Sequence, residues 1–174
     1  GSSSDQKVGL VAAGAATDGQ GGFTTLLGPR AVSTFVRGVS TYAIVAAGSD
    51  DGIQIMDVSD PSNPVPVSSA TDGEGGFTTL ERAQAVSTFE RDGRTYAIVA
   101  AIWDNGIQIV DVSDPSNPVA VSSATDGEGG FTTLLGAWAV STFVRGVSTY
   151  AIVAAFSDNG IQIVDVSDPS NPVP

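Results

Sequence analysis

Short apolar stretches separated by turn residues recur along the chain, and their spacing is that of strands. The first set comprises residues 31–37, 41–47, 53–58 and 65–70. Runs of four to eight residues rich in β-branched side chains are typical of strands, and glycine or proline interrupts every longer window. The pattern therefore predicts four strands in succession.

The connections between these stretches carry clear turn signals. A polar turn that ends in Asp51-Gly52 supplies the positive φ that a tight hairpin requires. The loop 59–64 contains two prolines, which cannot donate to a ladder and so end the third strand. A glycine-rich connection, 71–76, leads to the next apolar stretch, and a single helical turn is predicted at 78–82.

The chain contains three copies of the same sequence repeat. Tyr42 recurs as Tyr96 and Tyr150, which gives a repeat of 54 residues. The units cover residues 17–70, 71–124 and 125–174, after a flexible lead at 1–7 and a segment at 8–16. The first and third units differ at six positions out of 50. Such similarity indicates recent duplication or deliberate engineering.

The second strand of each unit decides between the possible all-β folds. Residues 41–47 are apolar on both faces, so the strand belongs to a sheet with a neighbouring sheet on each side. Stacked four-stranded propeller blades fit this pattern. A β-trefoil, which closes within one chain from three repeats of four strands, remains as the alternative, although this strand is too apolar for it.

The repeats also carry a family resemblance. The run Tyr96-Ala97-Ile98-Val99-Ala100-Ala101, followed by Asp104-Asn105-Gly106-Ile107-Gln108-Ile109-Val110-Asp111-Val112-Ser113-Asp114-Pro115-Ser116-Asn117-Pro118, resembles the LVIVD repeat family of β-propellers. The resemblance implies one four-stranded blade per repeat, in proteins often associated with the cell surface or the extracellular space. It implies no shared catalytic residues.

Three blades are fewer than the four to eight with which propellers typically close. Segment 8–16 precedes the first unit as a fourth strand precedes the next unit, and the third unit stops at Val173-Pro174. We therefore expect segment 8–16 to be an orphan fourth strand, donated to the last blade of a partner chain. The expected assembly is a six-bladed homodimer with terminal strand exchange, and a nine-bladed homotrimer is the second possibility.

Composition excludes several classes of function. The chain contains neither His nor Cys, so imidazole and thiolate nucleophiles and zinc ligands are absent. Its 19 acidic and 7 basic residues give a net charge of -12, which argues against nucleic acids and anionic membranes as partners. No apolar run approaches the roughly 20 residues of a membrane-spanning helix.

Acidic side chains gather in the loops expected on one face of the blades. Weak calcium candidates among them are Asp72, Glu74, Asp126 and Glu128, because Ca²⁺ accepts carboxylate and carbonyl oxygens. The sequence does not fit an EF-hand loop, since Phe77 stands where that loop needs glycine. Asx-turns combined with solubilising charge are the simpler interpretation.

Differences between the repeats cluster near the same face. Ligand pockets between blades are one interpretation of these positions, and drift at positions that the fold leaves free is the other. The candidate pocket residues are Arg30, Gln84, Trp138, Ile102, Trp103 and Phe156.

Catalysis is not expected. Asp57, Asp111 and Asp165 are predicted to accept backbone N–H groups of the following turn. Because every acid occurs three times, no pair of carboxylates is set apart for glycosidase chemistry. The sequence thus predicts a non-catalytic, self-assembling scaffold or interaction module that needs no cofactor. A lectin-like propeller that binds glycans or calcium through the acidic face is the alternative.

Overall fold

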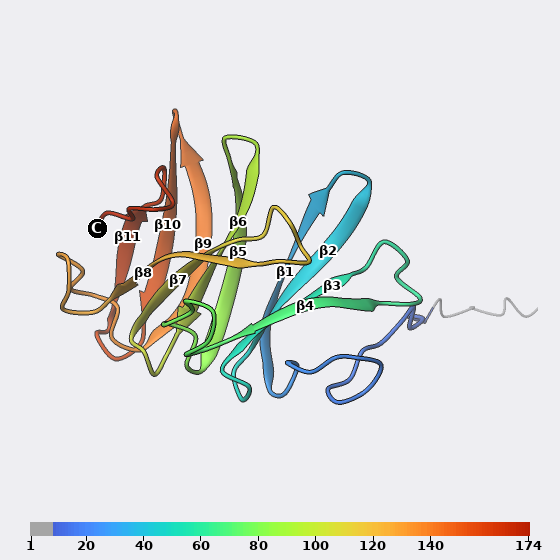
Figure 1. The fold of residues 1–174 in the computed structure, drawn as a ribbon. Coiled ribbons are helices and arrows are strands. Elements are labelled where there is room, and N and C mark those ends of the chain that lie inside the picture. The colour runs from blue at the N-terminus through green and yellow to red at the C-terminus, as the bar shows by residue number, and fades with distance from the viewer. Residues whose placement is uncertain (1–8) are drawn as a thin grey trace, which may run out of the picture.

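Three antiparallel sheets, one per repeat, make up the computed structural model, which describes residues 9–174 (Figure 1). The first sheet contains β1 (Pro29–Arg37), β2 (Ser40–Ala47), β3 (Gly52–Asp57) and β4 (Val65–Thr71), in that order. The second contains β5 (Ala83–Arg91), β6 (Arg94–Ala101), β7 (Gly106–Asp111) and β8 (Val119–Thr125). The third contains β9 (Ala137–Arg145), β10 (Ser148–Ala155) and β11 (Gly160–Asp165).

The sheets lie face to face in chain order, so the middle sheet is covered on both sides (Figure 1). One core lies between the first two sheets, where Ile44, Ile53 and Ile55 pack against Val99 and Val110. A second core of the same composition lies between the second and third sheets. Separate stacked sheets confirm the prediction of blade-like units and exclude the β-trefoil alternative.

The first strand of each sheet lies nearest its neighbouring sheets, because β1 contacts β5 and β5 contacts β9. Hydroxyl groups join these strands: Ser33 Oγ lies 2.8 Å from Thr88 Oγ1, and Ser87 Oγ lies 3.0 Å from Thr142 Oγ1. This is the arrangement of inner strands around a propeller axis.

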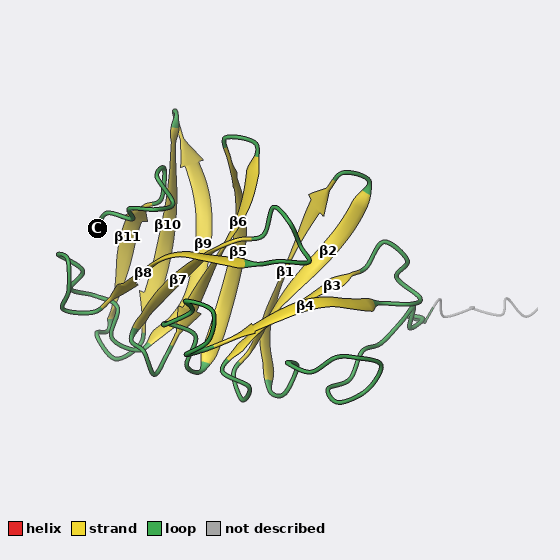
Figure 2. Ribbon diagram, in the orientation of Figure 1, coloured by secondary structure: helices red, strands yellow, loops and turns green. Residues whose placement is uncertain are grey.

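The predicted strands are confirmed to within two residues at each end, but the predicted helical turn at 78–82 is wrong. The described residues contain strands and loops and no helix, and therefore no helix that could cross a membrane (Figure 2). Arg82 adopts φ +59°, which a right-handed helix does not allow. Aspartate side chains from outside the segment instead accept the N–H groups of Leu80, Glu81 and Arg82.

The predicted orphan strand remains a prediction. Residues 9–16 carry no strand and are exposed, while residue 8 and the predicted flexible lead at 1–7 lie outside the described residues. In the third sheet, Val173 bridges Asp165 at the register position that Val65 has opposite Asp57.

Candidate functional site

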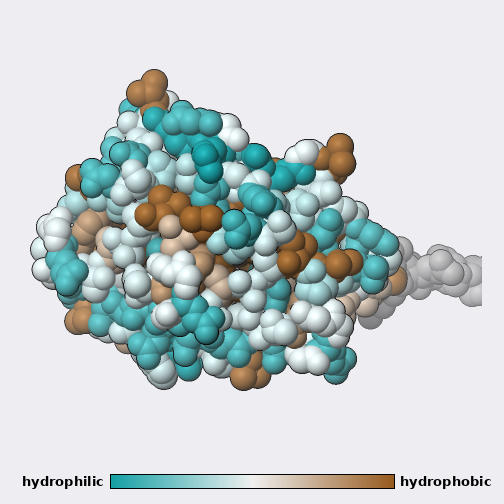
Figure 3. Space-filling model, in the orientation of Figure 1, coloured by the Kyte–Doolittle hydropathy of each residue, from teal (hydrophilic) through white to brown (hydrophobic). Residues whose placement is uncertain are grey.

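The two outer faces of the stack expose apolar residues whose equivalents in other repeats are buried, and they form the candidate site. We call the outer face of the first sheet the leading face; it contains Val32, Val45 and Met56. We call the outer face of the third sheet the trailing face; it contains Phe143, Ile161 and Ile163. Figure 3 shows apolar side chains on an otherwise mostly hydrophilic surface.

On the trailing face, residues are exposed that are buried in the other two repeats. Ile161 is 54% exposed, whereas its equivalents Ile53 and Ile107 are 0% exposed. Phe143 is 43% exposed, and its equivalent Phe89 is 8% exposed. The trailing face therefore presents the surface that the first two sheets each bury against the next sheet.

The leading face also exposes a residue whose equivalent is buried at an internal junction. Val32 is 62% exposed and its equivalent in the second sheet, Val86, is 7% exposed. The connection before β1 covers part of this face through Phe23 and Leu26, which pack against Val45 and Met56. A hollow of about 570 Å³ remains, with a mainly apolar lining that comes from this connection, β1 and the middle of the sheet.

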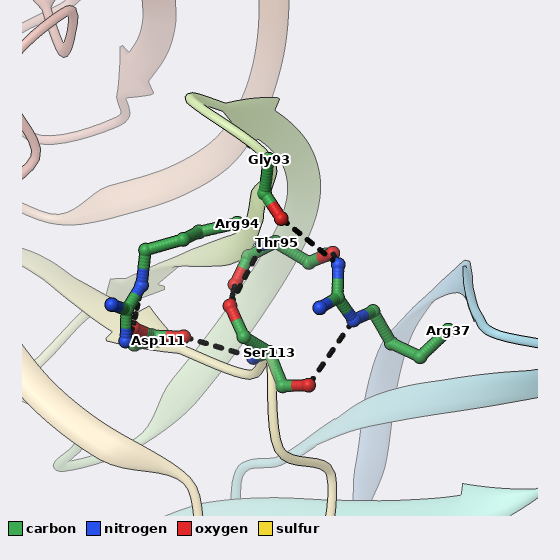
Figure 4. A network of polar contacts seen from close by, with 6 residues as sticks. All are labelled: Arg37, Gly93, Arg94, Thr95, Asp111 and Ser113. Atoms are coloured by element: carbon green, nitrogen blue, oxygen red, sulfur yellow. Dashed lines mark hydrogen bonds and ion pairs between the residues drawn. The ribbon is translucent and has the colours of Figure 1, made fainter.

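Arginine side chains at the ends of β1 and β5 donate hydrogen bonds to the next sheet. Arg37 donates from Nε to Ser113 O at 3.1 Å and from Nη1 to Gly93 O at 3.2 Å (Figure 4). At the following junction Arg91 Nη1 donates to Val147 O at 2.7 Å. Each internal junction between two sheets thus combines apolar contacts with hydrogen bonds from arginine.

The predicted acidic loop face exists, and its carboxylates hold the loops. Asp72 Oδ1 accepts Leu80 N at 2.9 Å, and Asp104 Oδ2 accepts Glu81 N at 2.7 Å. Asp51 Oδ1 accepts Arg82 N from the neighbouring sheet at 2.8 Å. Burial raises the pKa of Asp104, and hydrogen bonding to Glu81 N offsets part of that rise.

The weak calcium candidates divide into two kinds. Asp72 and its equivalent Asp126 each accept a leucine N–H, whereas Glu74 and Glu128 are exposed. Among residues 9–174, no three side chains of the metal-ligating types come together. Asp72 and Asp126 thus hold their own loop by accepting an N–H group eight residues away, a longer-range bond than the predicted Asx-turn.

The candidate pocket residues lie on three different sheets: Arg30 lines the hollow of the leading face, and Trp138 and Phe156 line a hollow on the trailing face. Ligand binding at these positions stays a prediction. Trp138 and Phe156 contact each other on the trailing face, with ring centroids 5.7 Å apart. Trp103 instead lies beside Arg82, whose guanidinium carbon is 5.2 Å from the ring centroid. The remaining members, Arg30, Gln84 and Ile102, occupy the positions equivalent to Trp138 and Phe156 in the first two repeats.

The aspartates at the ends of β3, β7 and β11 accept N–H groups of the following turn, as predicted. Ser59 N donates to Asp57 at 2.7 Å, Ser113 N donates to Asp111 at 2.9 Å, and the third repeat has the same bond. In the next loop, the Ser62 hydroxyl and its backbone N–H lower the pKa of Asp60.

Sequence reasoning missed the buried glutamines. Gln108 is 1% exposed; its Oε1 accepts Thr78 N at 3.1 Å and its Nε2 donates to Ser122 O at 2.7 Å. Its position between two isoleucines on an apolar strand was the available signal, because a polar side chain buried there must be hydrogen-bonded.

Stacked antiparallel sheets that repeat along the chain, two of four strands and one of three, define a repeat protein of the β-propeller class. The family model named LVIVD repeat matches residues 39–72, 95–126 and 147–173, which is just over half of the chain. The chain therefore belongs to the LVIVD repeat family. A comparison with curated proteins found no match.

Solved structures share the fold at low sequence identity. An exo-β-1,3-galactanase from Phanerochaete chrysosporium, with β-1,3-galactotriose, has a TM-score of 0.61 and 13% identity; the match covers 95% of this chain and 40% of that one. A functionally unknown protein from Desulfotomaculum acetoxidans has a TM-score of 0.53 and 14% identity, with 79% and 41% covered. The chain thus spans about two fifths of the length of these proteins. Likeness at this identity concerns the fold alone.

Proposed function

We propose that this chain is a non-catalytic propeller module that assembles with itself, and that two copies form a six-bladed ring. The trailing face of each copy packs on the leading face of the other. The observation that carries the proposal is that the two outer faces bear the residues that the chain buries at its own internal junctions.

Shape and chemistry support this pairing. At the internal junctions, the isoleucines of one sheet pack on the valines of the next, as Ile53 does with Val99 and Val110. The trailing face offers Ile161 and Ile163, and the leading face offers the exposed Val32 beside an apolar hollow. Covering both faces removes apolar surface from water, which is the main driving force of protein association.

Hydrogen-bonding groups match across the same surfaces. Ser33 pairs with Thr88 inside the chain, and the corresponding pair between copies is Ser141 with Thr34 of a second copy. Asn105 Oδ1 accepts Gly136 N at 2.9 Å. The corresponding acceptor on the trailing face is Asn159. Polar groups placed in this way fix the register of an interface.

Contacts of the segment before the first repeat support its donation to the third sheet of a second copy. Ser68 of β4 donates to Pro115 O of the following repeat at 2.5 Å. Gly14, at the position equivalent to Ser68, packs so closely on Pro61 O that a side chain there would clash. Ala16 and Thr17 line the hollow of the leading face, where an added fourth strand would pair with β11 of the other copy.

Two-fold symmetry closes this arrangement with two identical junctions. Six blades lie within the range of four to eight that propellers use, whereas three copies would give nine. The loop carboxylates bond to backbone N–H groups, which supports a structural role for them over a catalytic one. The ring is then a scaffold whose loop faces are free for interactions.

The test is the absolute mass in solution, measured by light scattering after size exclusion over a dilution series. We expect about twice the chain mass of 17.5 kDa. Ile161→Glu places a charge on the trailing face and should give the monomer mass. Val144→Glu adds the same charge at an exposed position where the second repeat has Glu90, and should leave the mass unchanged. A wild-type monomer at every concentration would refute the proposal.

A further inference from the structure

We infer that Trp138 and Phe156 are the anchor residues of the junction between two copies, and that they distinguish this junction from the two internal ones. The inference rests on the proposed self-assembly and adds the residues that set its strength. Both side chains are exposed, at 49% and 73%, and they contact each other beside Ile161 on the trailing face.

The first internal junction shows what these two positions touch. Gly48 is the equivalent of Phe156, and a Cβ on Gly48 would lie 3.0 Å from Ala83 O of the next sheet and 3.1 Å from Arg30 Cγ. Arg30 is the equivalent of Trp138. The two positions therefore form the rim at which one sheet meets the first strand of the next.

At the junction between copies, the residue facing this rim is Pro29 of a second copy, because Pro29 is the equivalent of Ala83. Pro29 lines the hollow of the leading face together with Leu27 and Val32. On the other side, Trp138 and Phe156 line a hollow of about 440 Å³. Two open apolar surfaces of this kind, one aromatic and one aliphatic, can fill each other.

The internal junctions carry different residues on this rim: Arg30 with Gly48 at the first, and Gln84 with Ile102 at the second. Those junctions are held by a continuous chain. A junction between two molecules must also overcome the loss of translational and rotational freedom. Buried Trp and other aromatic anchors supply a large share of the binding energy in such interfaces. The aromatic pair occurs only at the junctions between copies, where this additional binding energy is required.

The decisive variant gives the third repeat the rim of the second: Trp138→Gln together with Phe156→Ile. We expect the dissociation constant of the dimer, measured by sedimentation over a dilution series, to rise about thirtyfold or more. The circular dichroism spectrum should not change, since Gln84 and Ile102 already occupy these positions in the second repeat. The control is Trp103→Ser, which replaces an exposed tryptophan by the residue that the other repeats carry; it should leave the dissociation constant unchanged.

A spectroscopic readout follows the anchor directly. Trp103→Phe leaves Trp138 as the single tryptophan of the chain. Its emission should shift to shorter wavelength, and acrylamide quenching should decrease, as the concentration passes the dissociation constant. A stable dimer whose dissociation constant is unchanged in the double variant would overturn the anchor inference alone. A chain that stays monomeric, with unchanged quenching, would overturn the proposed assembly as well.

Discussion

The carboxylate of Asp111 illustrates how single residues distinguish otherwise equal repeats. It accepts Arg94 Nη2 at 2.7 Å and Nε at 2.9 Å, and it also accepts Ser113 N (Figure 4). The other repeats have Ser40 and Ser148 in place of Arg94. Burial raises the pKa of Asp111, but the hydrogen bonds from Ser113 and the charge of Arg94 outweigh burial and hold the pKa below 3.8.

Arg94→Ser should therefore lower the free energy of unfolding at pH 7 by less than about 1 kcal/mol, because Arg94 is largely exposed and its ion pair is screened by solvent. Asp111 has a depressed pKa in the folded state, so the contribution of its ion pair is present above the unfolded-state pKa and is lost as the pH falls through the folded-state value. Urea unfolding at pH 7 and at about pH 3 checks this. A difference between wild type and variant that stays the same at both pH values would contradict it.

Local bonds at the residue scale could be predicted from the sequence, and distant ones could not. Asp57 and its equivalents accept N–H groups two residues away, so the short motif contains both partners. Arg37 reaches Ser113 O, 76 positions along the chain. That bond depends on how the sheets stack, which no local pattern specifies.

A glycine at the start of the third strand of each repeat shows how closely the strands of a blade approach. A Cβ at Gly106 would clash with Ala124 O of β8, and Gly52 has the same relation to Ala70 O. At Gly160, the equivalent residue of β11, the same Cβ would meet the Thr133 Cγ2 methyl at 2.8 Å and no strand backbone. In the proposed ring, Ala16 O of a second copy fills that place.

Two matched alanine substitutions follow from this difference. Gly106→Ala forces β7 and β8 apart, so it should destabilise the chain by several kcal/mol, about the cost of overpacking a core. Gly160→Ala should cost the isolated chain much less, because only a side-chain methyl must move, but it should weaken the dimer by blocking the added strand. Thermal unfolding and a dilution series of the mass separate the two effects. Equal dimer affinity in wild type and Gly160→Ala would argue against strand exchange.

The elements themselves were largely predictable because their signals are local. Glycine, proline and Asp-Gly turns bound each strand, and β2 is apolar on both faces as a doubly covered strand requires. The error at 78–82 arose because the turn is held by Asp51 and Asp104, which belong to other parts of the chain. The candidate pocket residues occupy equivalent positions on different sheets, so the hollows that they line also depend on how the sheets stack.

The whole molecule is a stack with two unlike ends, which the proposed ring brings together. Its described termini lie on opposite sides of the stack (Figure 1). Because the trailing face and the Val32 side of the leading face are apolar and exposed in the single chain, folding without a partner leaves this surface in contact with water. Assembly should thus contribute directly to stability, as it does for proteins whose native state is an oligomer.

The melting temperature of the wild-type chain should accordingly rise with protein concentration. For a dimer that unfolds in one step to two chains, a hundredfold increase in concentration should raise it by about 4 °C, given the usual unfolding entropy per residue. Scanning calorimetry over that range checks the slope. Ile161→Glu, which places a charge on the trailing face, should melt at a lower temperature that does not depend on concentration. A wild-type melting temperature independent of concentration would show that the two faces do not meet, since mass action requires any native-state dimer to respond to dilution.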